Sequence, residues 1–450
     1  MIPEKFKEKM KDVLEGEYDE FIAALEGGEA VRGLRVNLIK TSAEKLVGDN
    51  EFTLEPLSYV DNGFILREER AMGASPYHHA GMVYMQDPGA MASAAALDIE
   101  PDWWVADLCA APGGKSSQIA ERLGKGGFIL SNEYVPKRAK IIVGNLERLG
   151  VRNAIVTSLD TARLRDMFCA TFDLVVVDAP CSGEGMFRKS EDAVEDWSPE
   201  NVRVCAERQR EILKNASNMV KAGGYLLYST CTYSKEENEE VVSAFLDSHP
   251  EFSLCKTDDR VRSATADGLD GLDEARRFYP HLQKGEGQFI ALMKKDEKCG
   301  YLPTILYKDS TNSPSKDEIA VINKFFADNL IERPEGRLIK WGNEVAIVNH
   351  DCPIPAQSVF MAGVMLGEVK KGVLIPHHQF FSAYGLMMKR QENLTATDER
   401  VLKYLRGEEI DTEIGENGFC AILYEDVALG GGKIVNGKIK NHYPKGLRNN

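Results

Sequence analysis

The sequence contains no membrane-spanning run and no cysteine pair spaced for a metal. No apolar stretch approaches the roughly 20 residues that a transmembrane helix needs, and residues 1–20 lack the apolar core of a signal peptide. The nine cysteines include no C-x-x-C pair, and their odd number does not suit a complete disulfide framework. We therefore expect a cytoplasmic protein with reduced thiols, no bound metal and no contact with a membrane.

An overall excess of basic charge is also missing. The chain of 450 residues has a formal net charge of -15, which argues against a nucleic-acid partner. The end of the sequence is the exception, because no acidic residue follows Asp426. The basic residues of this tail are Lys433, Lys438, Lys440, Lys445 and Arg448. Such a tail on an acidic protein still provides a local surface for phosphate groups.

Strand and helix patterns alternate over residues 81–295. Short apolar runs at 104–108, 128–132, 173–177 and 225–229 indicate buried strands that are followed by helical patterns. This alternation predicts an α/β, doubly wound, Rossmann-like core with helices on both faces of a parallel sheet. The other predicted parts are a small N-terminal α+β domain (1–80), a linker (296–311) and two C-terminal units (312–390 and 391–450).

Two cysteines follow strand-like runs in this core. Cys181 comes three residues after Asp178, and Cys231 comes directly after the run that ends at Thr230. Ligands bind at the carboxyl ends of the strands in doubly wound sheets, so we expect both thiols and Asp178 at the reaction site. Two thiols at this place indicate covalent chemistry on an electrophilic ring. The competing interpretation is a pair of buried, inert cysteines.

The loop after the first core strand, residues 107–116, is rich in small residues that let a ligand approach the backbone. Cys109 stands where a phosphate-binding loop needs its first glycine, and no G-x-G-x-x-G motif is present. We therefore expect a ligand without a pyrophosphate. Acids at the tips of four successive strands suit the ribose, adenine and sulfonium of S-adenosylmethionine. These acids are Asp107, Glu133, Asp160 and Asp178.

The segment after Cys231 has the pattern of a helix start. Ser234 followed by Glu237 matches a capping box, which predicts a helix from Lys235. Cys231 would then lie in the turn before a helix N-terminus, where the helix dipole favours a thiolate.

These motifs together resemble those of the Nop/Sun family of RNA cytosine-5 methyltransferases, and most of all its bacterial RsmF branch. The resemblance rests on residues 107–115, 178–185, 229–234 and 237–239, with further matching segments at 35–37, 86–91 and 440–448. It implies that Cys231 is the nucleophile that adds to C6 of cytosine. It also implies that Asp178 stabilises the adduct at N3, that Cys181 assists loss of the C5 proton and product release, and that Lys115 orients Asp178.

The resemblance also implies a cofactor site and an RNA surface. S-adenosylmethionine would be bound by Asp107, Cys109, Ala110, Ala111, Pro112, Gly113, Gly114, Lys115, Glu133, Arg138, Asp160 and Asp178. The implied substrate is 16S ribosomal RNA, naked or within the 30S subunit, and the enzyme is expected to be a monomer. Residues 391–450 would form a PUA-like RNA-docking domain. The residues expected to contact RNA are Arg35, Lys433, Lys440, Lys445 and Arg448.

Two other functions compete with this interpretation. The first is a P-loop-like NTPase, with residues 175–178 as a Walker-B-like strand, although Cys109 in place of glycine counts against it. The second is a non-catalytic RNA-binding factor of ribosome assembly on a methyltransferase fold. The presence of Cys181, Cys231 and Asp178 together argues against this loss of catalysis.

Overall fold

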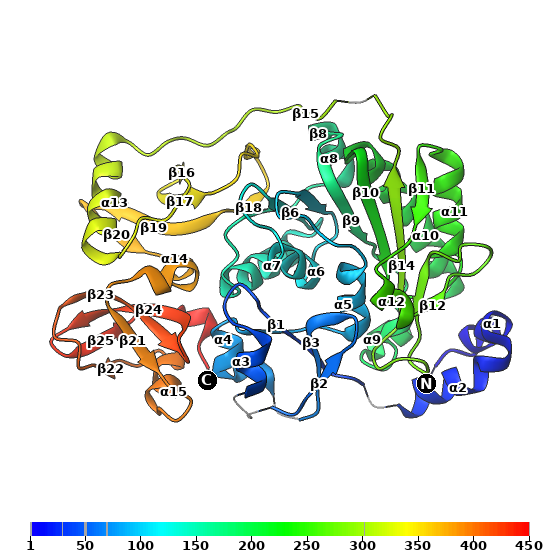
Figure 1. The fold of residues 1–450 in the computed structure, drawn as a ribbon, viewed down its shortest axis with the longest axis horizontal. Helices are drawn as coiled ribbons and strands as arrows, with labels where there is room; N and C mark the ends of the chain where they lie inside the picture. Colours follow the sequence, from blue (N-terminus) through cyan, green and yellow to red (C-terminus); the bar gives the residue numbers. More distant parts are fainter. Residues whose placement is uncertain (1, 29, 49–51, 69–70, 301, 450) are drawn as a thin grey trace.

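The structure is a computed structural model that describes residues 2–28, 30–48, 52–68, 71–300 and 302–449. A large sheet occupies its middle, and two smaller C-terminal sheets lie beside it (Figure 1). The chain returns at its end to the N-terminal unit, where the Asn449 side-chain oxygen lies 2.9 Å from Nε2 of His79. Within the described ranges, no helix is both long enough and apolar enough to cross a membrane.

The central sheet places its parallel strands in the middle. Its strands, in spatial order, are β12 (Ala266–Asp267), β13 (Arg276–Phe278), β14 (Gln288–Lys295), β10 (Val220–Thr230), β9 (Phe172–Asp178), β5 (Trp104–Asp107), β6 (Phe128–Asn132), β7 (Ala154–Thr157) and β18 (Val359–Ala362). Strands β10, β9, β5, β6 and β7 are parallel, whereas β14 is antiparallel to β10. A further strand, β11 (Phe252–Cys255), pairs with β14.

Helices cover both faces of this sheet. One hydrophobic cluster joins it to α8 (Thr161–Met167), α10 (Pro199–Met219) and α11 (Glu239–Ser248). A second cluster joins the other face to α5 (Pro88–Ala95), α6 (Gly114–Ala120), α7 (Pro136–Arg148) and α12 (Asp259–Ser263). Because both faces are covered, the parallel strands are buried along almost their whole length. The predicted doubly wound, Rossmann-like core is confirmed.

The N-terminal unit is built on a four-stranded sheet. Its spatial order is β2 (Leu54–Leu57), β3 (Val60–Leu66), β1 (Gly33–Val36) and β4 (Val83–Met85), accompanied by α3 (Ala43–Gly48) and α4 (Pro76–His79). The sheet therefore extends past residue 80, where the sequence suggested a boundary. Helices α1 (Glu4–Leu14) and α2 (Tyr18–Gly27) bury Phe6 and Phe21 against Trp197 and Tyr233 of the core.

The C-terminal region contains two sheets. The first has the order β16 (Arg337–Trp341), β17 (Glu344–Val348), β19 (Val364–Lys370) and β20 (Val373–Pro376), next to α13 (Lys316–Asn329) and α14 (His378–Tyr384). The second has the order β21 (Gln391–Leu394), β23 (Gly418–Tyr424), β24 (Val427–Val435), β25 (Lys438–Asn441) and β22 (Ile410–Asp411), next to α15 (Arg400–Leu405). Strand β18 comes from this region but pairs with β7, which ties the region to the core.

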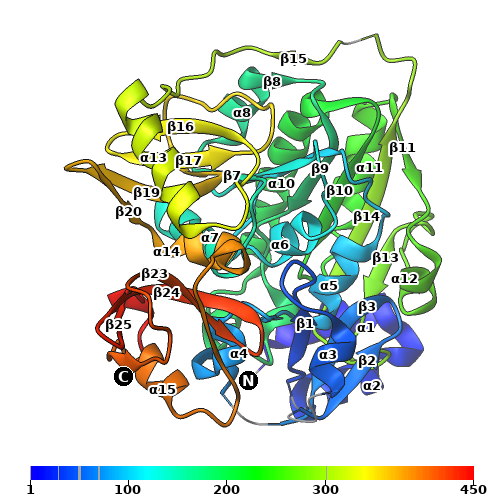
Figure 2. The ribbon, with the colours of Figure 1, turned by 60° about the vertical axis from the view of Figure 1, so that its left-hand side comes forward.

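The second C-terminal sheet packs against the N-terminal unit, beside α4 (Figure 2). Lys40 lies at this junction, and its Nζ donates to the Ala80 carbonyl at 2.9 Å, to Ser382 Oγ at 2.9 Å and to the Ala428 carbonyl at 2.8 Å. Burial lowers the pKa of Lys40 to about 7. One side chain thus connects three parts of the chain that are distant in sequence.

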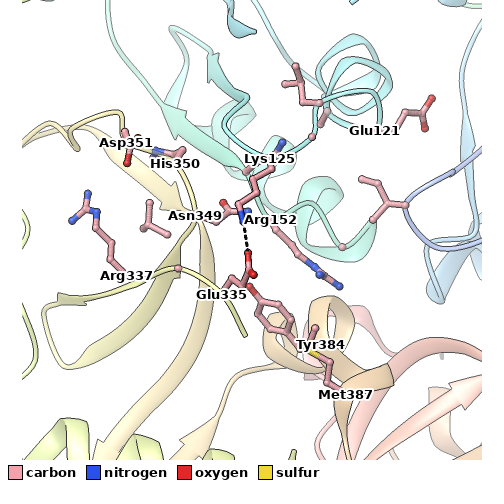
Figure 3. A pocket seen from close by; sticks show the side chains of 18 of the residues that line it. Glu121, Lys125, Arg152, Glu335, Arg337, Asn349, His350, Asp351, Tyr384 and Met387 are labelled. Carbon is pink, nitrogen blue, oxygen red and sulfur yellow. Dashed lines mark ion pairs between the residues drawn. The ribbon is translucent and has the colours of Figure 1, made fainter. Parts of the chain in front are cut away.

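A cavity of about 780 Å³ lies between the core and the first C-terminal sheet (Figure 3). Its lining includes Arg152, Arg337, His350 and Tyr384, and the Lys125–Glu335 ion pair, with Nζ and Oε2 3.5 Å apart, joins its two sides. Among the described residues that line it, none belongs to the predicted catalytic or cofactor-binding set. This cavity is therefore not the predicted active site.

Candidate active site

The two thiols meet at the carboxyl ends of adjacent strands. Strands β9 and β10 are parallel, and their register pairs Asp178 with Ser229. The loops that follow them therefore leave the sheet side by side, and Cys181 Sγ lies 3.3 Å from Cys231 Sγ. Both cysteines are free. The contact with Cys231 and burial hold the pKa of the Cys181 thiol well above its usual range.

Asp178 is fixed beside the thiols by two partners. Lys115 Nζ lies 2.8 Å from Asp178 Oδ2, and Ser229 Oγ donates to Asp178 Oδ1 at 2.8 Å. The Lys115 side chain is only 8% exposed, whereas the Asp178 side chain is 34% exposed. The lysine is thus held inside the protein while the carboxylate remains accessible to a ligand at the sheet edge.

The loop between β5 and α6 forms a tight turn next to this pair. Gly113 has a φ of 107°, a conformation that favours glycine, and its N–H donates to the Ala110 carbonyl at 2.7 Å. The Ala111–Pro112 peptide bond is cis. The Ala110 N–H donates to the Asn132 carbonyl at 2.8 Å, which anchors the loop to the end of β6.

Asp107 is the buried acid of this loop. Its Oδ2 accepts a hydrogen bond from Ser116 at 2.7 Å, while the buried Oδ1 has no hydrogen-bond partner among the described residues. Burial raises the pKa of Asp107 to about 7. A buried carboxylate oxygen without a partner, beside a small-residue loop, fits a cationic ligand such as S-adenosylmethionine.

The other predicted cofactor acids divide into two groups. Burial, and then the charges of Asp107, Asp178 and Glu133, raise the pKa of the Cys109 thiol. Glu133 is 4% exposed, and its Oε2 lies 3.3 Å from Arg138, which also donates to the Ala111 carbonyl. Asp160 instead lies exposed at the N-terminus of α8, where its side chain caps the Ala162 N–H.

The predicted helix start after Cys231 is wrong. Helix α11 begins at Glu239, with Asn238 as its N-cap and no side-chain cap. The Ser234 hydroxyl donates to Glu184, and the Glu237 carboxylate accepts from Ser182 and Gln209. These distant partners replace the local capping box. Cys231 therefore does not lie directly before a helix N-terminus.

Glu184 and Glu237 are buried acids beside the thiols that were not among the site residues predicted from the sequence. Both side chains are fully buried, and both accept hydrogen bonds from residues that follow the two cysteines. Their positions in the chain, three residues after Cys181 and six after Cys231, were the available signal. Among the described residues, no group of three or more His, Cys, Asp or Glu side chains is arranged to hold a metal ion.

The position of the Arg35 side chain contradicts the expectation that this residue contacts RNA. Its side chain is 1% exposed, and Nη1 lies 2.5 Å from Oε2 of the equally buried Glu121. Further hydrogen bonds run to Gln86 and Ser117. Since the guanidinium is enclosed by the core, Arg35 is not available to contact RNA. The sequence showed the charge of this residue but not the direction of its side chain.

Unlike Arg35, the lysines of the last sheet lie at the protein surface. Lys433 on β24 and Lys440 on β25 are exposed and form a cross-strand pair, and Lys445 is exposed in the turn that follows. Among the described residues, no acidic side chain forms an ion pair with these lysines. Arg448 is partly buried, and its guanidinium donates to the Tyr443 carbonyl.

Three family models match separate parts of the chain. Residues 2–88 match the N-terminal domain of 16S rRNA methyltransferase RsmF. Residues 94–294 match the 16S rRNA methyltransferase RsmB/F model. Residues 391–449 match the methyltransferase RsmF PUA domain.

Relatives match over nearly the full length. Ribosomal RNA small subunit methyltransferase F of Vibrio vulnificus strain YJ016 is 31% identical over 476 residues, which covers 99% of this chain and 97% of that protein. The protein of the same name from Klebsiella pneumoniae strain 342 is 31% identical over 463 residues, covering 99% and 96%.

Solved structures match the fold. A methyltransferase homologue from Pyrococcus horikoshii has a TM-score of 0.54 and 29% identity, covering 62% of this chain and 90% of that chain. NSun6 from Pyrococcus horikoshii with SFG has a TM-score of 0.56 and 22% identity, covering 65% and 98%.

The core fold and the matched models together define a methyltransferase with a Rossmann-like core and a C-terminal PUA domain. Within that class, the chain belongs to the ribosomal RNA small subunit methyltransferase F family. This membership leaves the NTPase interpretation of the loop at residues 107–116 without support.

Proposed function

We propose that this protein methylates C5 of cytosine in 16S ribosomal RNA, using S-adenosylmethionine. The observation that carries the proposal is the pair of thiols, 3.3 Å apart, beside the Lys115–Asp178 ion pair. Cytosine C5 is too weak a nucleophile to take a methyl group unaided. A thiol that adds to the ring and an acid that stabilises the adduct supply the activation that is needed.

The first step of the reaction belongs to Cys231. The Cys231 thiol gives up its proton and its sulfur forms a bond to C6 of the cytosine. The ring electrons move toward N3, which takes up a proton delivered through the Asp178 carboxyl group and returns it when the product is released. Lys115 and Ser229 hold the Asp178 carboxyl group in place for this contact. The resulting enamine-like C5 is electron-rich and able to accept a methyl group.

Methyl transfer and release of the product follow, and Cys181 acts in the release. S-adenosylmethionine supplies the methyl group, and Asp107, Glu133 and the loop at residues 107–116 would hold it. Once C5 carries both a methyl group and a proton, Cys181 assists the loss of that proton. The C6–sulfur bond then breaks, and its electron pair returns to Cys231. The aromatic ring is restored as 5-methylcytosine.

The substrate must reach the two thiols as an unstacked base. A cytosine inside a helix cannot present C6 to Cys231, so single-stranded or locally opened RNA is the proposed substrate form. We propose that residues 391–450 dock the RNA, with Lys433, Lys440 and Lys445 contacting phosphates. The exposure of these lysines supports this role.

The test is transfer of a labelled methyl group from S-adenosylmethionine to unmodified 16S RNA and to 30S subunits. We expect label in RNA as 5-methylcytosine with the wild-type protein. Cys231→Ala is expected to abolish transfer, and Cys181→Ala to leave a covalent protein–RNA adduct on a denaturing gel. The reverse pattern in the two variants would overturn the thiol roles. Tight RNA binding without any transfer would favour an assembly factor.

A further inference from the structure

We propose that Glu184 and Glu237 form a reciprocal clasp between the loop after β9, which carries Cys181, and the loop after β10, which carries Cys231. This clasp holds the two thiol loops together and sets the position of Cys181 relative to Cys231. The clasp serves the proposed methyl transfer, so its catalytic consequences rest on that function. Both glutamates are positioning residues, because their carboxylates bond to the residues next to the thiols and not to the sulfur atoms.

Glu184 reaches from the Cys181 loop to the Cys231 loop. It begins the single-turn helix η3 (Glu184–Met186), three residues after Cys181. Its Oε2 accepts from Thr232 Oγ1 at 2.7 Å and from the Tyr233 N–H at 2.9 Å, and its Oε1 accepts from Ser234 Oγ at 2.5 Å. These are the three residues that directly follow Cys231.

Glu237 makes the opposite connection. It lies six residues after Cys231, and its Oε2 accepts from the Ser182 N–H at 3.0 Å. Its Oε1 accepts from the Ser182 hydroxyl, and Gln209 donates to Oε2 at 2.8 Å. Ser182 directly follows Cys181. Each thiol loop therefore sends one carboxylate to the polar groups that come after the other thiol.

Two direct contacts between the loops complete the clasp. The hydroxyls of Ser182 and Thr232, which each follow a catalytic cysteine, lie 3.0 Å apart. The Gly185 N–H donates to the Cys231 carbonyl at 2.8 Å. The loops are thus joined by hydrogen bonds at the residues that follow the two cysteines, whose sulfur atoms lie 3.3 Å apart, so a shift of one loop would move its thiol relative to the other.

The chemistry of the clasp argues against a purely structural role. Glu184 and Glu237 are both 0% exposed, and no cation within the described ranges forms an ion pair with either. Buried carboxylates held only by neutral donors are costly, and an apolar core would stabilise the fold more cheaply. Burial raises the pKa of Glu237 to about 7, which reflects this cost. The benefit is directional: each oxygen fixes hydrogen-bond donors at set positions.

The first experiment measures the distance between the thiols without RNA. Diamide oxidises two neighbouring thiols to a disulfide, taking up their two electrons and two protons. Peptide mass mapping would follow formation of the Cys181–Cys231 bond in wild type, Glu184→Ala, Glu184→Gln, Glu237→Ala and Glu237→Gln. We expect rapid disulfide formation in wild type, at least about tenfold slower formation in the alanine variants and intermediate rates in the glutamine variants, because glutamine keeps one acceptor oxygen.

A matched control separates positioning from stability. Glu121→Gln removes a similarly buried carboxylate that bonds to Arg35 at the C-terminal end of α6 and takes no part in the clasp. It is expected to lower stability without changing the rate of disulfide formation. Wild-type oxidation rates in folded Glu184→Gln and Glu237→Gln, checked by circular dichroism, would overturn the clasp. Failure of the wild-type thiols to form the disulfide would also overturn it.

The second experiment reads the same variants in single-turnover methyl transfer. We expect the transfer rate to fall while the affinities for S-adenosylmethionine and RNA stay unchanged, with glutamine restoring part of the rate lost in alanine. A lower affinity at an unchanged rate would contradict positioning. If the wild type methylated no RNA, the proposed function would fail, and the diamide measurement would still decide whether the clasp exists.

Discussion

The two regions proposed to act on RNA differ in the burial of their charged side chains. The edge of the central sheet that carries Cys181 and Cys231, called the thiol edge here, encloses its ionisable groups. Glu184 and Glu237 are fully buried, and the Lys115 side chain is 8% exposed in its ion pair with Asp178. On the last sheet, Lys433 and Lys440 are exposed side by side on adjacent strands. Enclosed groups with fixed partners define geometry, which sets the rate of a reaction. Exposed cations attract phosphate from a distance and set affinity.

The sharpest test of this contrast is Asp178→Asn at the thiol edge. Loss of the acid that stabilises the adduct is expected to lower the single-turnover rate about 10²–10⁴-fold, the usual share of general acid–base catalysis. RNA affinity is expected to stay unchanged. Asp173→Asn, at the other end of the same strand, is the control. A wild-type rate for Asp178→Asn would remove Asp178 from the mechanism.

Arg35 tests whether an enclosed cation contributes to structure and not to RNA binding. Arg35→Met leaves the buried Glu121 without its ion-pair partner, which is expected to lower the free energy of unfolding by about 3–5 kcal/mol. Urea denaturation measures the loss, and filter binding measures RNA affinity of the folded fraction. Weaker RNA binding with unchanged stability would restore the original expectation that Arg35 contacts RNA.

The buried Asp107 predicts a pH dependence of cofactor binding. Its pKa is raised to about 7 by burial, so the free protein holds it largely protonated below neutral pH. A cationic ligand favours the carboxylate, so affinity for S-adenosylmethionine should rise with pH up to neutrality, by at most about tenfold per pH unit. Isothermal titration calorimetry between pH 5 and pH 8 would measure it, with Asp107→Asn expected to flatten the profile. A flat wild-type profile would exclude Asp107 from the cofactor site.

The smallest expected effect belongs to the exposed lysines. The double variant Lys433→Ala/Lys440→Ala should weaken RNA binding several-fold. Each lost phosphate contact on a single strand reduces the slope of log K against log salt concentration by about 0.7, so the loss of two contacts should reduce this slope by about 1.4. The rate at saturating RNA should not change. Lys370→Ala, on the other C-terminal sheet, is the control. An unchanged salt dependence would move the RNA-docking surface away from β24 and β25.

Features that depend on local pattern were predictable. The apolar runs that end at Asp178 and Thr230 give the strands, and parallel strands bring their carboxyl ends together, so both cysteines and Asp178 could be assigned to one edge. The small-residue loop after Asp107 was predictable for the same reason. The capping box was not, since Ser234 and Glu237 fit that pattern locally but bond to Glu184 and Ser182 in the folded chain.

By itself, the sequence determined the doubly wound core, the two thiols at strand ends and the basic character of the last residues, because periodicity, residue type and charge are properties of the chain. Only the tertiary structure decided which charges are enclosed. Arg35 turns inward to Glu121, Lys433 and Lys440 stay outside, and Glu184 and Glu237 cross between the thiol loops. Burial and hydrogen-bond partners arise from segments distant in sequence, and these contacts exist only after the segments have packed.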